Sequence, residues 1–89
     1  MNKEIIVISA VWCPSCLILK KHLKKINEEY NIEFNYLDYD LDEDSVSNYN
    51  VGDTLPVIIV KDNDKEINRM VGEKSYDEII AFLKEVEVI

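Results

Sequence analysis

The run Ile5-Ile6-Val7-Ile8 is the feature that most restricts what this chain can fold into. β-branched side chains favour an extended backbone, and four apolar residues in succession leave no polar face for water. Such a run is typical of a strand that is covered on both sides, as in the centre of an α/β sheet. We therefore expect a strand over residues 4–10, with other elements packed on both of its faces.

The segments that follow alternate between helical and extended patterns. Apolar residues at steps of three and four predict a helix from Pro14 to about Tyr30, and proline suits its first position. The further expected elements are a strand at 33–38, a short helix within 41–48, strands at 57–61 and 65–71, and a last helix that Ser75 and Glu78 cap. This order, βαβαββα, predicts a single α/β domain over residues 1–89, with the first two strands parallel and the last two forming an antiparallel hairpin.

Finer expectations concern single side chains. The buried stripe of the first helix is expected to hold Cys16, Leu19, Leu23, Ile26 and Tyr30, widened by Leu17 and Ile18. In the strand at 65–71, Ile67 and either Met70 or Val71 are expected to face inward. Residues 62–64, Asp-Asn-Asp, have the chemistry of a tight hairpin turn because Asn and Asp tolerate the left-handed region.

Both cysteines of the chain, Cys13 and Cys16, fall at the junction between the first strand and the first helix. Residues three apart lie on the same side of a helix, so the two sulfurs can close into a disulfide or open into a dithiol. A CxxC at such a junction in an intracellular chain is typical of a redox pair. The amino end of the helix would also stabilise a sulfur anion at Cys13, and the thiolate is the form that attacks disulfides.

The charge balance excludes some partners. The chain has 18 acidic and 10 basic residues and a net charge of −8, whereas nucleic-acid binding needs a basic surface. No stretch is long and apolar enough to span a membrane, and the run at residues 5–10 is too short and too β-branched for a signal peptide. We therefore expect a cytoplasmic, monomeric protein that binds neither nucleic acid nor membranes.

Three motifs, taken in this order, resemble the thioredoxin family over nearly the whole chain. Residues 12–16, WCPSC, are similar to the active-site Trp-Cys-x-x-Cys at the start of the first core helix. Residues 54–56, TLP, resemble the turn with a cis proline that faces this site, and Gly72 with the helix after it resembles the closing segment. The residues that the resemblance implies are Cys13 and Cys16 as the catalytic pair, Trp12, Pro14 and Ser15 in support, and Thr54, Leu55, Pro56 and Gly72 for substrate binding.

The resemblance implies a thioredoxin-like fold, with a four-stranded mixed sheet flanked by helices. It also implies a thiol-disulfide oxidoreductase that reduces protein disulfides through Cys13 and Cys16. Its partners would be protein disulfides and an electron donor, either a thioredoxin-reductase-type protein or glutathione. The redox-active disulfide would serve in place of a cofactor, with no metal. A cis Pro56 would bring the backbone of Leu55 beside the sulfurs, where an extended substrate segment can pair with it.

Among the departures from the thioredoxin pattern, two concern the proton of Cys16. Val7 stands where thioredoxins usually carry a buried Asp, and Tyr36 stands where a lysine often partners that Asp. The usual proton acceptor for Cys16 is therefore missing. We hypothesise that release of substrate from Cys13 is slower here than in relatives that carry the Asp.

Three other interpretations stay open at this point. A glutathione-dependent glutaredoxin is favoured by Pro14 as the first residue between the cysteines. It is disfavoured by Val11 and Trp12, which occupy the place where a basic residue often precedes the first cysteine, and by Gly72, which has no second glycine beside it. A metal-binding module is the second: zinc needs four ligands, and two cysteines with His22 could supply them only between two molecules. The third is an inactive interaction domain of the same fold, against which the intact cysteine pair argues.

Overall fold

A computed structural model describes residues 3–89 of the protein. Its elements are β1 (Lys3–Ser9), α1 (Pro14–Tyr30), β2 (Asn35–Asp38), α2 (Glu43–Ser47), β3 (Val57–Asp62), β4 (Lys65–Val71) and α3 (Tyr76–Glu85). The predicted order βαβαββα is confirmed. The single domain over residues 1–89 stays a prediction, and residues 1 and 2 lie outside the described part.

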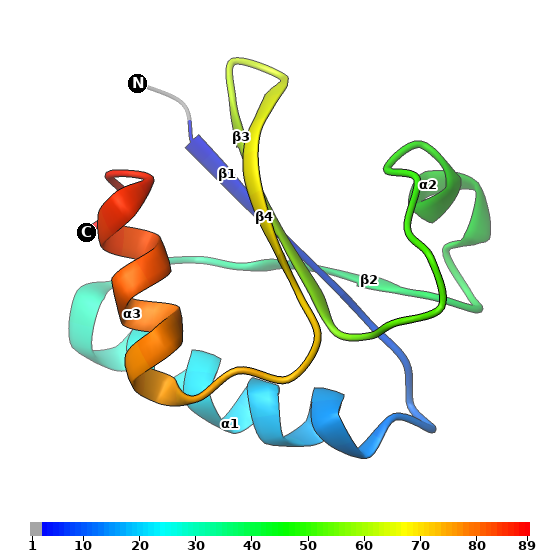
Figure 1. Cartoon of the computed structure of the whole chain (residues 1–89), viewed down its shortest axis with the longest axis horizontal. Helices are drawn as coiled ribbons and strands as arrows, with labels where there is room; N and C mark the ends of the chain where they lie inside the picture. The colour runs from blue at the N-terminus through cyan, green and yellow to red at the C-terminus, as the bar shows by residue number, and fades with distance from the viewer. Residues whose placement is uncertain (1–2) are drawn as a thin grey trace.

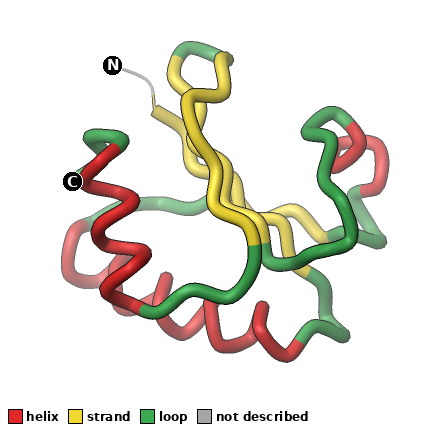
Figure 2. The backbone as a smooth tube through the Cα atoms, viewed as in Figure 1, coloured by secondary structure: helices red, strands yellow, loops and turns green. Residues whose placement is uncertain are grey.

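The strands form one mixed sheet in the order β2-β1-β3-β4. β1 pairs in parallel with β2 and antiparallel with β3, and β3 and β4 form the expected antiparallel hairpin. α1 and α3 lie on one side of this sheet and α2 on the other (Figures 1 and 2). Ile5 through Ser9 of β1 are all buried, so the prediction of a strand covered on both faces is confirmed.

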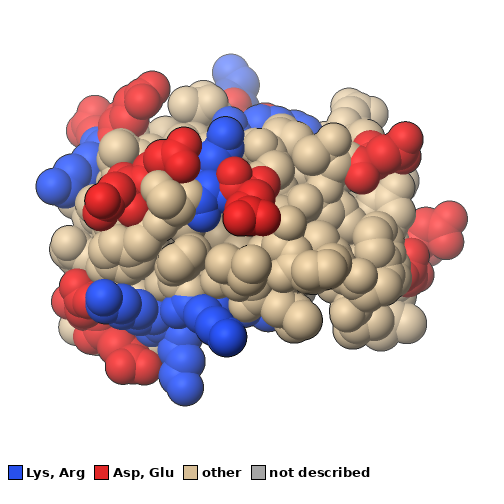
Figure 3. Space-filling model, turned by 60° about the horizontal axis from the view of Figure 1, so that its bottom comes forward, with Lys and Arg blue, Asp and Glu red and all other residues tan. Residues whose placement is uncertain are grey.

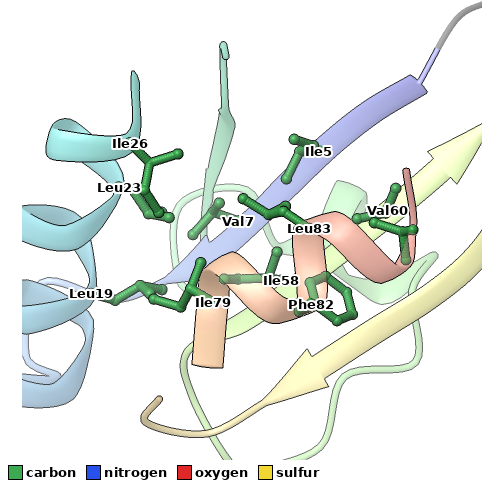
Figure 4. Packing of buried hydrophobic residues seen from close by; sticks show 11 residues of the cluster. Ile5, Val7, Leu19, Leu23, Ile26, Ile58, Val60, Ile79, Phe82 and Leu83 are labelled. Atoms are coloured by element: carbon green, nitrogen blue, oxygen red, sulfur yellow. The ribbon is translucent and has the colours of Figure 1, made fainter. Parts of the chain in front are cut away.

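Alternate side chains of β1 and β3 divide the buried residues between the two faces of the sheet. Ile5, Val7, Ile58 and Val60 point toward α1 and α3, where they meet the apolar stripes of both helices (Figure 4). This α1/α3 cluster contains Ile5, Val7, Leu19, Leu23, Ile26, Ile58, Val60, Ile79, Phe82, Leu83 and Val86. It joins two helices and the two central strands into one apolar core.

A second cluster joins the side chains on the opposite face of the sheet to both cysteines at the start of α1. Ile6, Ile8, Val57 and Ile59 supply its sheet side, and Val46 is the contribution of the short helix α2. The remaining members of this cysteine cluster are Ala10, Cys13, Cys16 and Leu55. These four residues lie in the β1–α1 turn, in the first turn of α1 and in the segment before β3, so loops cover much of this face.

Local signals in the sequence set several ends and turns. At the start of α3, the N–H of Glu78 donates to Ser75 Oγ at 3.2 Å, and the N–H of Ser75 donates to Glu78 Oε1 at 3.0 Å. The capping box is therefore confirmed. Asn63 and Asp64, between β3 and β4, adopt positive φ angles of 51° and 68°, as expected for a tight turn.

The prediction that the buried stripe of α1 includes Leu17, Ile18 and Tyr30 is wrong. Leu17 and Ile18 are 54% and 44% exposed, and Tyr30 at the end of the helix is 42% exposed. Leu17 and Ile18 point roughly 100° and 200° around the helix from Cys16, while the sheet contacts only a narrower stripe. The buried residues of α1 are Cys16, Leu19, Leu23 and Ile26.

The prediction that Ile67 faces inward is also wrong, since its side chain is 46% exposed. Asn68 pairs with Val60 and Glu66 pairs with Lys61, which leaves Ile67 as an extra residue in a register shift. Such a bulge re-aims a side chain, and no pattern in the sequence marks it. Met70 is the residue of β4 that packs against the α1/α3 cluster.

No helix among residues 3–89 combines the length and the apolar character needed to cross a membrane.

Candidate active site

Cys13 occupies the N-cap position of α1, with Pro14 in the first turn. The chain reaches it through a turn in which the N–H of Cys13 donates to the carbonyl of Ala10 at 3.2 Å. The N–H of Cys16 donates to Cys13 Sγ at 3.3 Å, so the sulfur takes the place that a Ser or Asp oxygen takes in an ordinary cap. A backbone N–H and the positive end of a helix both favour a sulfur anion at this position.

Cys16 lies one helical turn further along and is fully buried, whereas Cys13 is 6% exposed. Burial, followed by a hydrogen bond with Cys13, raises the pKa of the Cys16 thiol to about 11. A backbone hydrogen bond from Ala10 and the charge of Lys20 oppose this shift. At neutral pH Cys16 therefore holds its proton. Val7, at the place of the usual carboxylate, is itself fully buried in the α1/α3 cluster.

Trp12 stands at the surface beside the cysteines, with 59% of its side chain exposed. Its indole Nε1 donates to Asp40 Oδ2 at 2.7 Å, and its ring meets the Tyr39 ring edge-to-face at 6.4 Å between centroids. Asp40 is held for this bond because its own N–H donates to Asp38 Oδ1 at 2.9 Å. The structure thus places Trp12 as an oriented surface ring and not as part of the core.

Ser15, between the two cysteines, links the start of α1 to the segment that follows β4. Its Oγ donates to Glu73 Oε1 at 2.8 Å. Glu73 follows Gly72, whose N–H donates to the carbonyl of Pro56 at 2.8 Å. Gly72 has a φ of +90°, a backbone conformation that favours glycine, so this residue makes the turn out of β4.

The Leu55–Pro56 peptide bond is cis, as the resemblance implied. Leu55 belongs to the same buried cluster as Cys13 and Cys16. Within residues 3–89, neither the N–H nor the carbonyl of Leu55 has a backbone hydrogen-bond partner. Thr54 approaches Gly72: its Cγ2 is 3.6 Å from the point where a Cβ on that glycine would stand.

The residues singled out in the sequence are thus brought together around one pair of sulfurs by three segments, 12–16, 54–56 and 72–73. Their individual roles stay predictions. Sequence reasoning missed Asp40 as the partner of Trp12 and Glu73 as the partner of Ser15. It also missed Lys20, whose Nζ lies 5.6 Å from the centre of the Tyr36 ring. Nothing in the sequence pairs Ser15 with a residue 58 positions away.

His22, the third residue of the hypothetical metal site, lies apart from the sulfurs. Its ring packs against Tyr76 of α3, with 6.1 Å between centroids. Across residues 3–89, no three or more His, Cys, Asp or Glu residues gather in a way that could hold a metal ion.

The sequence model of the thioredoxin family matches residues 1–85. The chain belongs to the thioredoxin family. Membership supports activity as a thiol-disulfide oxidoreductase, with protein disulfides and a reductase as the usual partners of the family. No curated protein matches the sequence at a significant level.

Solved thioredoxin structures share the fold of this family member. Reduced Schistosoma mansoni thioredoxin pre-protein superposes with a TM-score of 0.83 at 24% identity, over 94% of this chain and 78% of that one. Fasciola hepatica thioredoxin gives 0.84 at 19% identity, over 94% and 80%. Thioredoxin-2 of the malaria parasite, a component of its protein secretion machinery, gives 0.75 at 26% identity, over 96% and 85%. The predicted thioredoxin-like fold is confirmed.

Proposed function

We propose that this protein reduces disulfides of other proteins by dithiol–disulfide exchange through Cys13 and Cys16. One observation carries the proposal. Cys13 Sγ caps α1 and accepts the N–H of Cys16, while Cys16 is buried one turn away. An attacking sulfur at a helix amino end and a second sulfur within reach of it are the two parts that the reaction needs.

The first step forms a mixed disulfide. The Cys13 thiolate attacks one sulfur of the substrate disulfide, the substrate S–S bond breaks, and its other sulfur leaves as a thiolate that takes up a proton. In the second step Cys16 gives up its proton and attacks Cys13 Sγ. The remaining substrate sulfur leaves, and the Cys13–Cys16 disulfide forms. Two electrons have then passed from the dithiol to the substrate, and an external thiol donor must return them.

The second step is the slower one in this proposal. Burial raises the pKa of Cys16 to about 11, and Val7 offers no carboxylate to take its proton. The proton would pass to the departing substrate thiolate or to water. Only the small ionised fraction of Cys16 attacks at neutral pH.

The substrate segment would lie along Thr54, Leu55 and Pro56, with Gly72 at its side. Among residues 3–89 the backbone groups of Leu55, next to the cysteines, have no backbone partner, which supports this because an extended peptide binds by pairing with such groups. Trp12 would supply a flat apolar contact, which its exposure and its bond to Asp40 support.

The test is an insulin-type disulfide reduction assay, run with a thioredoxin reductase and separately with glutathione. We expect turnover with the reductase, no turnover for Cys13→Ser, and a trapped substrate adduct for Cys16→Ser, visible by mass spectrometry. Turnover by the Cys13→Ser variant would refute the proposal. Glutathione alone driving the reaction as fast as the reductase would instead favour the glutaredoxin alternative, which the Pro14-Ser15 dipeptide suggests.

We also propose that the protein works as a cytoplasmic monomer. Reducing conditions there would keep the two thiols available, and the net charge of −8 disfavours nucleic acid as a partner.

A further inference from the structure

We infer that Glu73 makes this site select disulfides flanked by positively charged groups and reject negatively charged ones. The inference rests on the proposed function and specifies the substrate class that the site prefers. It assigns Glu73 as a specificity-determining residue beside the cysteines.

The carboxylate of Glu73 is anchored at the reacting sulfurs. Ser15 lies between Cys13 and Cys16 in the chain, and its hydroxyl donates to Glu73 Oε1 at 2.8 Å. The main chain before Glu73 is fixed by the bond from the Gly72 N–H to the Pro56 carbonyl at 2.8 Å. Glu73 is itself exposed, so its charge faces an incoming substrate.

A second carboxylate lies at the site through Trp12, whose Nε1 donates to Asp40 Oδ2. The two carboxylates are therefore tied to residues on either side of Cys13 in the chain. A disulfide that reaches the Cys13 sulfur passes between two segments that each carry a negative charge.

The segments that build the site supply no cation to offset these charges. Residues 4–19 contain no Lys, Arg or His, and residues 26–60 contain none either but hold nine Asp and Glu residues. The cation that does act on the pair is Lys20, one turn further along α1, whose charge lowers the pKa of Cys16 and whose Nζ lies 5.6 Å from the centre of the Tyr36 ring. Lys74 follows Glu73 in the chain, and its charge also acts on Glu78 of α3, whose pKa is lowered first by hydrogen bonds to Ser75 and then by Lys74.

The surface shows the same uneven distribution of charge. In this view basic and acidic side chains lie together at one end of the molecule, while the opposite end shows no basic side chain and carries acidic ones at its margin (Figure 3). On this face a negatively charged disulfide such as oxidised glutathione meets no basic side chain at that end. A basic substrate meets the two carboxylates.

The test uses three small disulfides of different charge on the fully reduced protein: cystamine, hydroxyethyl disulfide and dithiodiglycolate, which are cationic, neutral and anionic. Their reaction rates are followed by stopped-flow fluorescence of Trp12, the single tryptophan of the chain. The cation and anion rates are each divided by the neutral rate, which removes any general change in sulfur reactivity. We expect the wild type to favour cystamine, and Glu73→Gln to lower the cation-to-anion ratio about threefold to tenfold. Glutamine keeps an acceptor for Ser15 and removes only the charge.

Glu28→Gln is the matched control. It removes the same charge from an exposed position on α1, about 20 Å along the helix from Cys13. We expect it to leave the ratio as in the wild type, and added salt to bring the wild-type ratio toward one. An unchanged cation-to-anion ratio in Glu73→Gln, or an equal change of that ratio in Glu28→Gln, would overturn this inference and leave the proposed function standing. No reaction of the wild type with the neutral disulfide would overturn the proposed function instead.

Discussion

The two faces of the sheet differ in what covers them. The α1/α3 cluster is built from two helices and the two central strands, and its members are aliphatic or aromatic side chains. The cysteine cluster has sheet residues on one side, but on the other it has the five-residue helix α2, two loops and the first turn of α1. Long helices can bury large apolar stripes, whereas loops leave backbone groups and side chains free to bind. The α1/α3 cluster therefore mainly stabilises the fold, and the cysteine cluster carries the reactive residues.

Neighbouring residues of β1 belong to different clusters. Val7 points into the α1/α3 cluster and its neighbour Ile8 into the cysteine cluster. The position at which thioredoxins usually carry an acid therefore belongs, in this chain, to the stabilising face. The four predictions that follow challenge or sharpen this division, in order of decreasing effect.

Val7→Asp would break the division by placing an acid in the apolar cluster. An uncompensated carboxylate at this fully buried site should lower the free energy of unfolding by about 3–5 kcal/mol. Because thioredoxins usually carry the proton acceptor of the second cysteine at this position, the same carboxylate should accept the Cys16 proton and speed the decay of the mixed disulfide, timed by release of a chromophoric thiol from Cys13. Val7→Asn, which loses the same packing without a proton acceptor, is the control. Equal decay rates in Val7→Asp and the wild type would count against the slow-resolution hypothesis.

Leu23→Ala tests the stabilising face alone. Leu23 is fully buried in α1, so removing its side chain should cost about 2–5 kcal/mol of unfolding free energy, measured by denaturant titration. Leu17→Ala makes the same substitution on the same helix at a side chain that is 54% exposed, and should cost roughly 0.5 kcal/mol or less. The rate of disulfide reduction per folded molecule should stay unchanged in Leu23→Ala. A large loss of that rate would show that the two faces are not separable.

The pH dependence of the second chemical step tests the cysteine face. Because burial raises the pKa of Cys16 to about 11, the rate of mixed-disulfide decay should rise roughly tenfold per pH unit above pH 7. Folding is linked to the same proton, which the folded state holds more tightly than the unfolded chain does. Its contribution to stability is present below the ordinary thiol pKa and is lost as the pH rises through about 11. A decay rate that does not change between pH 7 and pH 9 would show that another group already takes the proton.

Ser75→Ala removes half of the capping box at the start of α3 and should cost about 1 kcal/mol. Hydrogen bonds to Ser75 hold the pKa of Glu78 below its usual value. The matching stability is present above the ordinary Glu pKa and is lost as the pH falls through the lowered one. The variant keeps the backbone N–H of residue 75, which is the largest cause of the lowered pKa, and loses only the hydroxyl; it should therefore lose slightly less stability than the wild type between pH 6 and pH 3 in denaturant titrations. Ser47→Ala, whose hydroxyl bonds only to the Asp44 carbonyl, is the control for loss of a hydroxyl.

Much of this molecule could be predicted because its signals are local. The β-branched run at residues 5–8 predicted a strand covered on both faces, and the CxxC before a proline-led helix predicted the cysteine pair at the helix start. The capping box at Ser75 and the Asn-Asp turn at 63–64 were likewise predicted from a few adjacent residues. Each of these features depends on backbone preferences or periodicity within a dozen residues, which the order of amino acids alone specifies.

The tertiary structure alone decided what meets the cysteines. Whether Leu17 is buried depends on how α1 sits on the sheet, and whether Ile67 faces inward depends on a bulge where β3 and β4 pair. The bond of Trp12 to Asp40 and that of Ser15 to Glu73 join residues 28 and 58 positions apart. Such contacts form only after strand order and loop path have brought distant segments together. The sequence alone therefore determined that two sulfurs stand at the start of a helix, and the tertiary structure determined which carboxylates lie beside them.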